Sequence, residues 1–117
     1  MIFAETDMTD FKPKRPPHRQ PTHPGELMRE TIEEHLGISI SEAARRMEVT
    51  RQALHDVLRG EAKVTADMAL RFSAIGGGTA ELLLAMQDNH DLWQARRRLA
   101  PTLRRIEHAG AKGLPAG

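Results

Sequence analysis

The sequence predicts an all-α domain of five short helices, and two observations lead to that prediction. From His23 onward, apolar residues recur at the three- and four-residue spacing of buried helix faces, and no stretch shows the alternation of a half-buried strand. Residues that typically begin or end helices stand at the boundaries of each periodic stretch. We therefore expect three parts: a flexible tail over 1–21, a helical domain over 22–99 and a C-terminal tail over 100–117.

The first predicted helix spans 24–36. Pro24 suits its first turn, because the missing N–H would be unpaired there in any case. Gly37 can end it in a left-handed conformation. Ser39 and Glu42 form a capping-box pattern, in which each side chain accepts a hydrogen bond from the other residue's backbone N–H.

The second helix begins after Ser39 and ends near Met47, and similar signals mark the other helices. The third is bounded by Thr50 and Gly60, the fourth by Thr65 and Gly76-Gly77-Gly78, and the fifth is capped by Thr79.

Composition argues against an enzyme or a metal protein. The chain has no cysteine, and its six histidines are widely spaced, with no pair at i, i+4. The triple glycine lacks the lysine and hydroxyl residue of a phosphate-binding loop. We expect no catalytic residue, no metal and no cofactor. Because the apolar stretch at the N-terminus is too short for a signal peptide and no run could span a membrane, we expect a cytoplasmic protein without membrane contact.

The second and third helices have the pattern of a helix-turn-helix. Only three residues, 47–49, separate them, and Ala44 is small where the third helix would pass over the second. Leu54 and Val57 stand three apart and would face inward. An ordinary helical hairpin uses the same buried residues, so only the exposed face of the third helix can distinguish it from a DNA-binding helix-turn-helix.

That exposed face carries polar groups suited to DNA. Arg51, Gln52 and His55 lie on the N-terminal side of the third helix, where a recognition helix contacts base edges. Arginine matches guanine O6 and N7, and glutamine matches adenine N6 and N7. The candidate phosphate contacts are Thr50, at the positive end of the helix, and Arg59 and Lys63 beyond it.

Charge is segregated between the two ends of the sequence. The helix over 24–36 has one arginine against four glutamates, whereas 92–117 has six basic residues against one glutamate. The fifth helix also has apolar residues on almost every side of one turn, more than a small domain can bury alone. We expect its apolar residues to form a homodimer interface, with Leu82, Leu83, Met86 and Trp93 as its members.

Three stretches resemble the HigA antitoxin family, part of the XRE or Cro/C1-type helix-turn-helix class. They are His23-Pro24-Gly25-Glu26-Leu27, the stretch from Ser39 to Gln52, and Thr65-Ala66-Asp67-Met68-Ala69-Leu70-Arg71-Phe72. The resemblance continues to about residue 97. It implies a five-helix, lambda-repressor-like fold and a homodimer formed through the last helix. It also implies binding to double-stranded operator DNA, repression of the protein's own operon and neutralisation of a HigB-type mRNA-cleaving toxin.

Three residues depart from the family pattern. Ile40 stands where the class often has a polar residue that contacts phosphate. Glu48 replaces the usual turn glycine, at a cost of about 1 kcal/mol for a left-handed residue. Leu83 replaces an aromatic residue, and Trp93 can fill part of that volume. Two other functions fit the sequence: a stand-alone regulator without a toxin, and a toxin-neutralising module that does not bind DNA.

Overall fold

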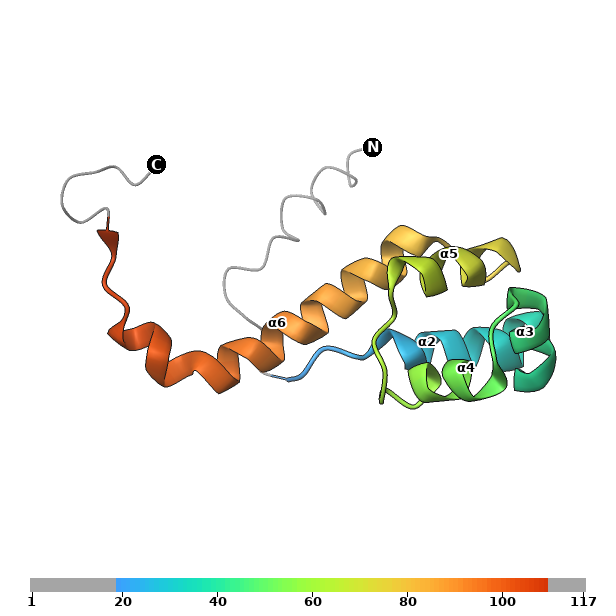
Figure 1. Ribbon diagram of the computed structural model, residues 1–117, viewed down its shortest axis with the longest axis horizontal. Helices are drawn as coiled ribbons and strands as arrows, with labels where there is room; N and C mark the ends of the chain where they lie inside the picture. Colours follow the sequence, from blue (N-terminus) through green and yellow to red (C-terminus); the bar gives the residue numbers. More distant parts are fainter. Residues whose placement is uncertain (1–18, 110–117) are drawn as a thin grey trace, which may run out of the picture.

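The computed structural model describes residues 19–109, and within that range the protein is entirely helical, as the sequence predicts (Figure 1). The elements are α2 (Pro24–Glu30), which continues into the π-helical η1 (Thr31–Leu36), then α3 (Ile40–Met47), α4 (Arg51–Leu58), α5 (Ala66–Ala74) and α6 (Ala80–Arg105). With α2 and η1 taken as one helix, these are the five expected helices. None of the helices in the described part of the chain is both long and apolar enough to cross a membrane.

The predicted helix starts are confirmed by their caps. The side chains of Ser39, Thr50, Thr65 and Thr79 each accept a hydrogen bond from the N–H three residues on, at 3.0–3.2 Å. The second half of the capping box at Ser39 is not formed. The Glu42 carboxylate instead accepts from the guanidinium groups of Arg45 and Arg46, because two charged donors attract it more strongly than one backbone N–H.

The first helix begins at a histidine cap. The Nδ1 atom of His23 accepts from the Gly25 N–H at 2.9 Å. Burial and the adjacent His90 ring lower the pKa of His23, which favours the neutral ring that this bond requires. Glycine at position 25 allows α2 to pack closely on α4, since a Cβ there would overlap the Val57 carbonyl oxygen.

The helix over 24–36 has the expected limits but widens at Thr31 into π-helical hydrogen bonding. At that junction the Thr31 hydroxyl donates to the Leu27 carbonyl oxygen at 2.8 Å, so a side chain takes part in the hydrogen-bond ladder. Gly37 ends the helix with φ +63°, as the sequence predicts.

A single core joins all the helices. Its largest fully buried side chains include Phe72, Met28, Ile32, Leu54 and Leu83. α5 packs on α6, and α2 packs on both α4 and α6, so the helix pair α3–α4 rests on a fixed support (Figure 1). Because Leu83 is only 1 % exposed, it belongs to the core of its own chain.

The C-terminal end of α6 lies beyond the boundary expected from the sequence. The C-terminal tail does not begin at residue 100, because α6 continues through Pro101 to Arg105. A proline within a helix removes one backbone donor, and neighbouring turns of a long helix can tolerate that loss. The orange and red part of α6 extends away from the other helices (Figure 1). Most of the predicted N-terminal tail, residues 1–18, lies outside the described residues.

Candidate nucleic-acid interface

The turn between α3 and α4 has the expected helix-turn-helix geometry. Glu48 adopts a left-handed conformation, with φ 60° and ψ 43°, as predicted for the residue that replaces the turn glycine. The Val49 N–H donates to the Ala44 carbonyl oxygen at 3.0 Å and closes the turn. Ala44 and Met47 are each 2 % exposed, so the angle between the two helices is filled by side chains.

Arg71, a residue of α5, holds this turn through hydrogen bonds to its backbone. The Nη1 atom of Arg71 donates to the carbonyl oxygens of Met47 at 2.8 Å and Glu48 at 3.2 Å. Its Nε atom donates to the Asp67 carboxylate at 2.9 Å. These contacts of Arg71 with the turn were not predicted from the sequence. The i, i+4 spacing from Asp67 predicts only the ion pair.

The structure brings the predicted base-reading residues together on one face of α4. Thr50, Arg51 and Gln52 are exposed at the start of the helix, and His55 is half-buried one turn further on. The opposite face buries Leu54, Val57 and Leu58 in the core. A rigid helix therefore presents its first turn to the solvent, as a recognition helix does.

Two of these side chains are held by neighbours that the sequence analysis did not single out. The Nε atom of Arg51 donates to the Ser41 hydroxyl at 2.9 Å, which joins the first turns of α3 and α4. A guanidinium has five N–H donors, so four are left after this bond. The Nε2 atom of Gln52 donates to the Asp56 carboxylate at 2.8 Å. The Thr50 hydroxyl accepts from Ala53 as a cap, and its own proton can still be donated to a phosphate.

The two outer phosphate candidates are placed differently. Arg59 ends α4 and pairs with the Glu61 carboxylate at 2.7 Å. Lys63 lies away from the first turn of α4 and pairs with Asp91 of α6 at 3.2 Å. The connection between α4 and α5 runs back along α6, where the buried Gln87 side chain accepts from the Val64 N–H at 2.8 Å.

The start of α3 combines an apolar residue, Ile40, with exposed polar and charged residues. Ile40 is half-buried and packs against the core, so it offers no polar group to DNA. The adjacent Ser41 is exposed and provides a hydroxyl one position later. Arg45 and Arg46 are exposed and share the single carboxylate of Glu42, which leaves an excess of positive charge. Hydrogen bonds from these two guanidinium groups lower the pKa of Glu42 to about 2.

The expected dimer residues on α6 divide into two groups. Leu82 is 50 % exposed, and Met86 and Trp93 are half-buried. Leu83 belongs to the core of its own chain and is only 1 % exposed, so, contrary to the expectation, it offers no surface to a partner. Three exposed leucines further along α6 were not singled out: Leu92, Leu99 and Leu103.

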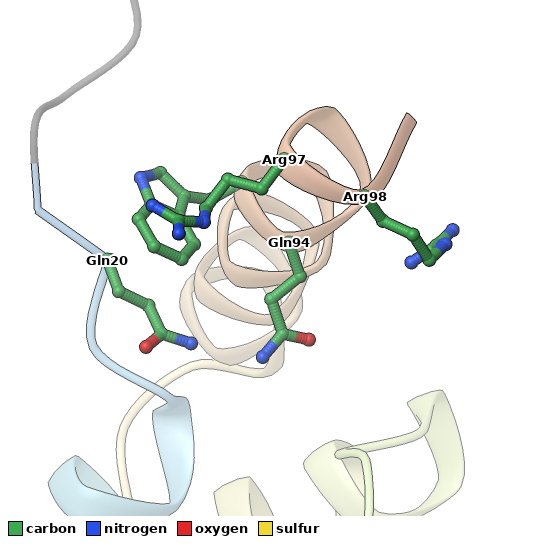
Figure 2. Close-up of a pocket in the computed structure, with 5 residues that line it drawn as sticks. Gln20, Gln94, Arg97 and Arg98 are labelled. Carbon is green, nitrogen blue, oxygen red and sulfur yellow. The ribbon is translucent and has the colours of Figure 1, made fainter. Parts of the chain in front are cut away.

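The basic end of α6 forms a separate surface. Figure 2 shows Arg97 and Gln94 projecting from α6 on the side nearer to Gln20, whereas Arg98 points away from it. Together with Trp93 these residues line an open groove of about 530 Å³. The Arg97 guanidinium lies 4.9 Å from the centroid of the Trp93 ring, a cation–π distance. This end of α6 extends away from α3 and α4 in Figure 1, so its charge does not add to the face of α4.

Comparison with known proteins also identifies a helix-turn-helix in this chain. The helix-turn-helix family matches residues 28–83. Virulence-associated protein A' of Dichelobacter nodosus is 37 % identical over 87 residues, which cover 74 % of this chain and 75 % of that protein. Antitoxin HigA-1 of Vibrio cholerae is 32 % identical over 80 residues, which cover 68 % of this chain and 75 % of that protein.

Solved structures of antitoxins have the same fold. The antitoxin GraA superposes with a TM-score of 0.69 at 32 % identity, over 76 % of this chain and 97 % of that one. The Pseudomonas aeruginosa antitoxin HigA, solved with the higBA promoter, superposes with a TM-score of 0.68 at 27 % identity, over 74 % of this chain and 96 % of that one.

Proposed function

Because this chain belongs to the HigA family of XRE-type helix-turn-helix proteins, we propose that it is the antitoxin of a type II toxin–antitoxin system. In this proposal it binds operator DNA as a homodimer, represses its own operon and neutralises a HigB-type mRNA-cleaving toxin. The observation that carries the DNA-binding part is the exposed first turn of α4. It presents Thr50, Arg51, Gln52 and His55 on a helix fixed by its buried face.

The proposed mode of DNA binding follows from these groups. Arg51 and Gln52 read base edges in the major groove, with His55 beside them. The Thr50 and Ser41 hydroxyls donate to phosphates on either side of the turn, and Arg59 contacts the backbone beyond α4. In this mode Lys63 has at most a secondary contribution, because it lies away from the first turn of α4 and pairs with Asp91 of α6.

Exposed apolar residues on α6 support the homodimer. Leu82, Leu92 and Leu103 are about half exposed, at 50 %, 48 % and 47 %, and Leu99 is 37 % exposed. Unpartnered apolar surface of this extent along one helix favours self-association. A two-fold axis through α6 would place the two copies of α4 on a palindromic site, about 34 Å apart.

The DNA-binding part is tested with duplex DNA from upstream of the protein's own gene. We expect a sequence-specific complex whose affinity falls by about 1–3 kcal/mol in Gln52→Ala, with relaxed preference at one base position. Gln94→Ala, on the distal part of α6, serves as the matched control and should bind like the wild type. Equal binding by Gln52→Ala and the wild type would show that α4 does not read the operator.

The toxin-binding part is tested by co-expression with the neighbouring gene. We expect the neighbouring product to co-purify with this protein, and its mRNA cleavage to stop in the complex. If the neighbouring product neither binds nor cleaves mRNA, the protein is a stand-alone regulator. That alternative is consistent with the relatives in Haemophilus influenzae and Escherichia coli that are named only as HTH-type transcriptional regulators.

One structural observation favours the second alternative, a neutralising module that does not bind DNA. Ile40 gives the start of α3 an apolar side chain where a phosphate contact is expected. In that case the toxin would co-purify, but no sequence-specific shift would occur with the upstream DNA.

A further inference from the structure

One exposed hydrogen bond on α4 affects which DNA base the Gln52 side chain can recognise. The Gln52 Nε2 atom donates to the Asp56 Oδ1 atom at 2.8 Å, one helical turn away on the same side of α4. Asp56 is half-buried, and its backbone carbonyl oxygen accepts from the N–H groups of Glu61 at 2.9 Å and Ala62 at 3.2 Å. The position of Asp56 is therefore fixed by the turn that follows α4.

This bond restricts what the Gln52 amide can offer to DNA. The amide has two N–H donors and one oxygen acceptor, and its oxygen and nitrogen ends can exchange by rotation about the last bond of the side chain. A carboxylate accepts hydrogen bonds and cannot donate one when ionised. Asp56 therefore holds the nitrogen end toward itself. One N–H and the oxygen remain for a base.

That remaining pair matches one base better than its competitor. In the major groove adenine presents an acceptor at N7 and a donor at N6, which need one N–H and one oxygen. Guanine presents two acceptors, N7 and O6, so the Gln52 oxygen would face an acceptor and lose its bond. A held amide rejects guanine, whereas an amide that is free to rotate adapts to it at lower cost.

The location of Asp56 also has a cost. A carboxylate on the surface that faces DNA repels phosphates and lowers affinity for every sequence. What this position provides is the contact of the Asp56 carboxylate with the Gln52 amide, which donates to it at 2.8 Å.

We propose that Asp56 is a specificity-determining residue, which positions the Gln52 amide so that α4 selects adenine over guanine at one operator position. This inference rests on the proposed DNA-binding function. Asp56 itself acts through Gln52 and need not touch a base.

Three variants separate positioning from charge. Asp56→Ala removes both the acceptor and the charge. Asp56→Asn removes the charge and keeps an oxygen that can accept from Gln52, but its amide can also donate to the Gln52 oxygen. Glu61→Ala removes a nearby acidic group that pairs with Arg59 and serves as the matched control. Thermal melts monitored by circular dichroism establish that each variant is folded.

The experiment measures binding of the purified full-length protein to two operators that differ only at the base position relaxed by Gln52→Ala. We expect the wild type to prefer adenine over guanine by about tenfold or more, as a good bidentate contact gives. Asp56→Ala should bind both operators more tightly but lose most of that preference. Asp56→Asn should also bind both operators more tightly but keep only part of the preference, because its amide can hold either end of Gln52. Glu61→Ala should bind more tightly and keep the full preference.

A double-variant cycle shows whether Asp56 acts through Gln52. In a Gln52→Ala background, Asp56→Ala should change affinity for both operators equally. The inference is overturned if Asp56→Ala keeps the wild-type preference, or if the wild type prefers a base other than adenine there. Sequence-specific binding by the wild type together with either result leaves the proposed function intact. Absence of any sequence-specific binding by the wild type refutes both this inference and the DNA-binding part of the proposed function.

Discussion

The guanidinium of Arg71 donates to the carbonyl oxygen of Met47 at 2.8 Å, and this bond joins α5 to the turn between α3 and α4. The last carbonyl groups of a helix have no partner within the helix, so a charged donor at this point both satisfies them and stabilises the helix end. The turn that sets the angle of the proposed recognition helix is therefore held by a side chain more than twenty residues away in sequence.

Replacing Arg71 by alanine should destabilise the fold by about 1.5–3 kcal/mol, because hydrogen bonds from a charged group to the turn carbonyls are lost. Chemical denaturation measures this free energy of unfolding. Arg59→Ala is the control, since its ion pair with Glu61 is exposed and should contribute less than about 1 kcal/mol. Equal losses of unfolding free energy in the two variants would show that the turn contacts of Arg71 stabilise the fold no more than an exposed ion pair does.

Replacing Glu48 by glycine should stabilise the protein by about 0.5–1 kcal/mol. A left-handed residue with a side chain costs about 1–2 kcal/mol, and the greater freedom of glycine in the unfolded chain cancels part of the gain. Glu48→Ala removes the same carboxylate but keeps the strain, so its midpoint of denaturation should not rise. A rise in both variants would assign the effect to the lost charge instead.

Replacing Gln87 by leucine should destabilise the protein by about 1–3 kcal/mol, because the Val64 N–H loses its acceptor in a buried position. The measurement is again denaturation, with Gln94→Leu as an exposed glutamine of the same helix for comparison. We expect the control to lie within about 0.5 kcal/mol of the wild type. A loss of less than about 1 kcal/mol in Gln87→Leu would mean that water or a shifted backbone provides an acceptor for the Val64 N–H.

The pH dependence of Glu42 has a defined sign. Its pKa in the folded protein is about 2, below the ordinary value of 4.5, because Arg45 and Arg46 donate to the carboxylate. The stabilisation from this group is therefore present above pH 4.5 and is lost as the pH falls toward 2. Carboxyl chemical shifts in an NMR titration should show this low pKa, and replacing both arginines by alanine should return it toward 4.5. An unchanged pKa in that double variant would contradict the assigned cause.

Replacing Leu92 and Leu99 by glutamate should convert the proposed dimer to a monomer of about 13.1 kDa, because two charges would enter its apolar interface. Sedimentation equilibrium measures the mass. Leu70→Glu is the control, since Leu70 is 62 % exposed but lies on α5. A dimer that persists in the double variant would place the interface elsewhere.

Much of the fold was predictable because helix boundaries depend on neighbouring residues. Thr50 caps α4 through an N–H only three residues away. The left-handed conformation of Glu48 was expected because it stands where the resembling family has its turn glycine. The exposed face of α4 followed from the same periodicity that buries Leu54 and Val57.

Contacts between distant segments were not predictable in this way. The hydrogen bond from Arg51 to Ser41 depends on the angle between α3 and α4. Lys63 pairs with Asp91 because the connection between α4 and α5 runs along α6. The side on which Leu83 lies depends on how α6 rotates to pack, so its apolar character fitted a core and an interface equally well. The end of α6 was also missed, since a proline usually predicts a helix boundary.

The sequence by itself determined the five helices, their caps, the strained turn at Glu48 and the polar face of α4, because each of these depends on residues within about one helical turn. The tertiary structure decided which groups support that face. Arg71 fixes the turn beneath it, Ser41 restrains Arg51, and Leu83 is withdrawn into the core. The physical reason is that these contacts depend on how helices cross and rotate, which is set by packing of the whole core.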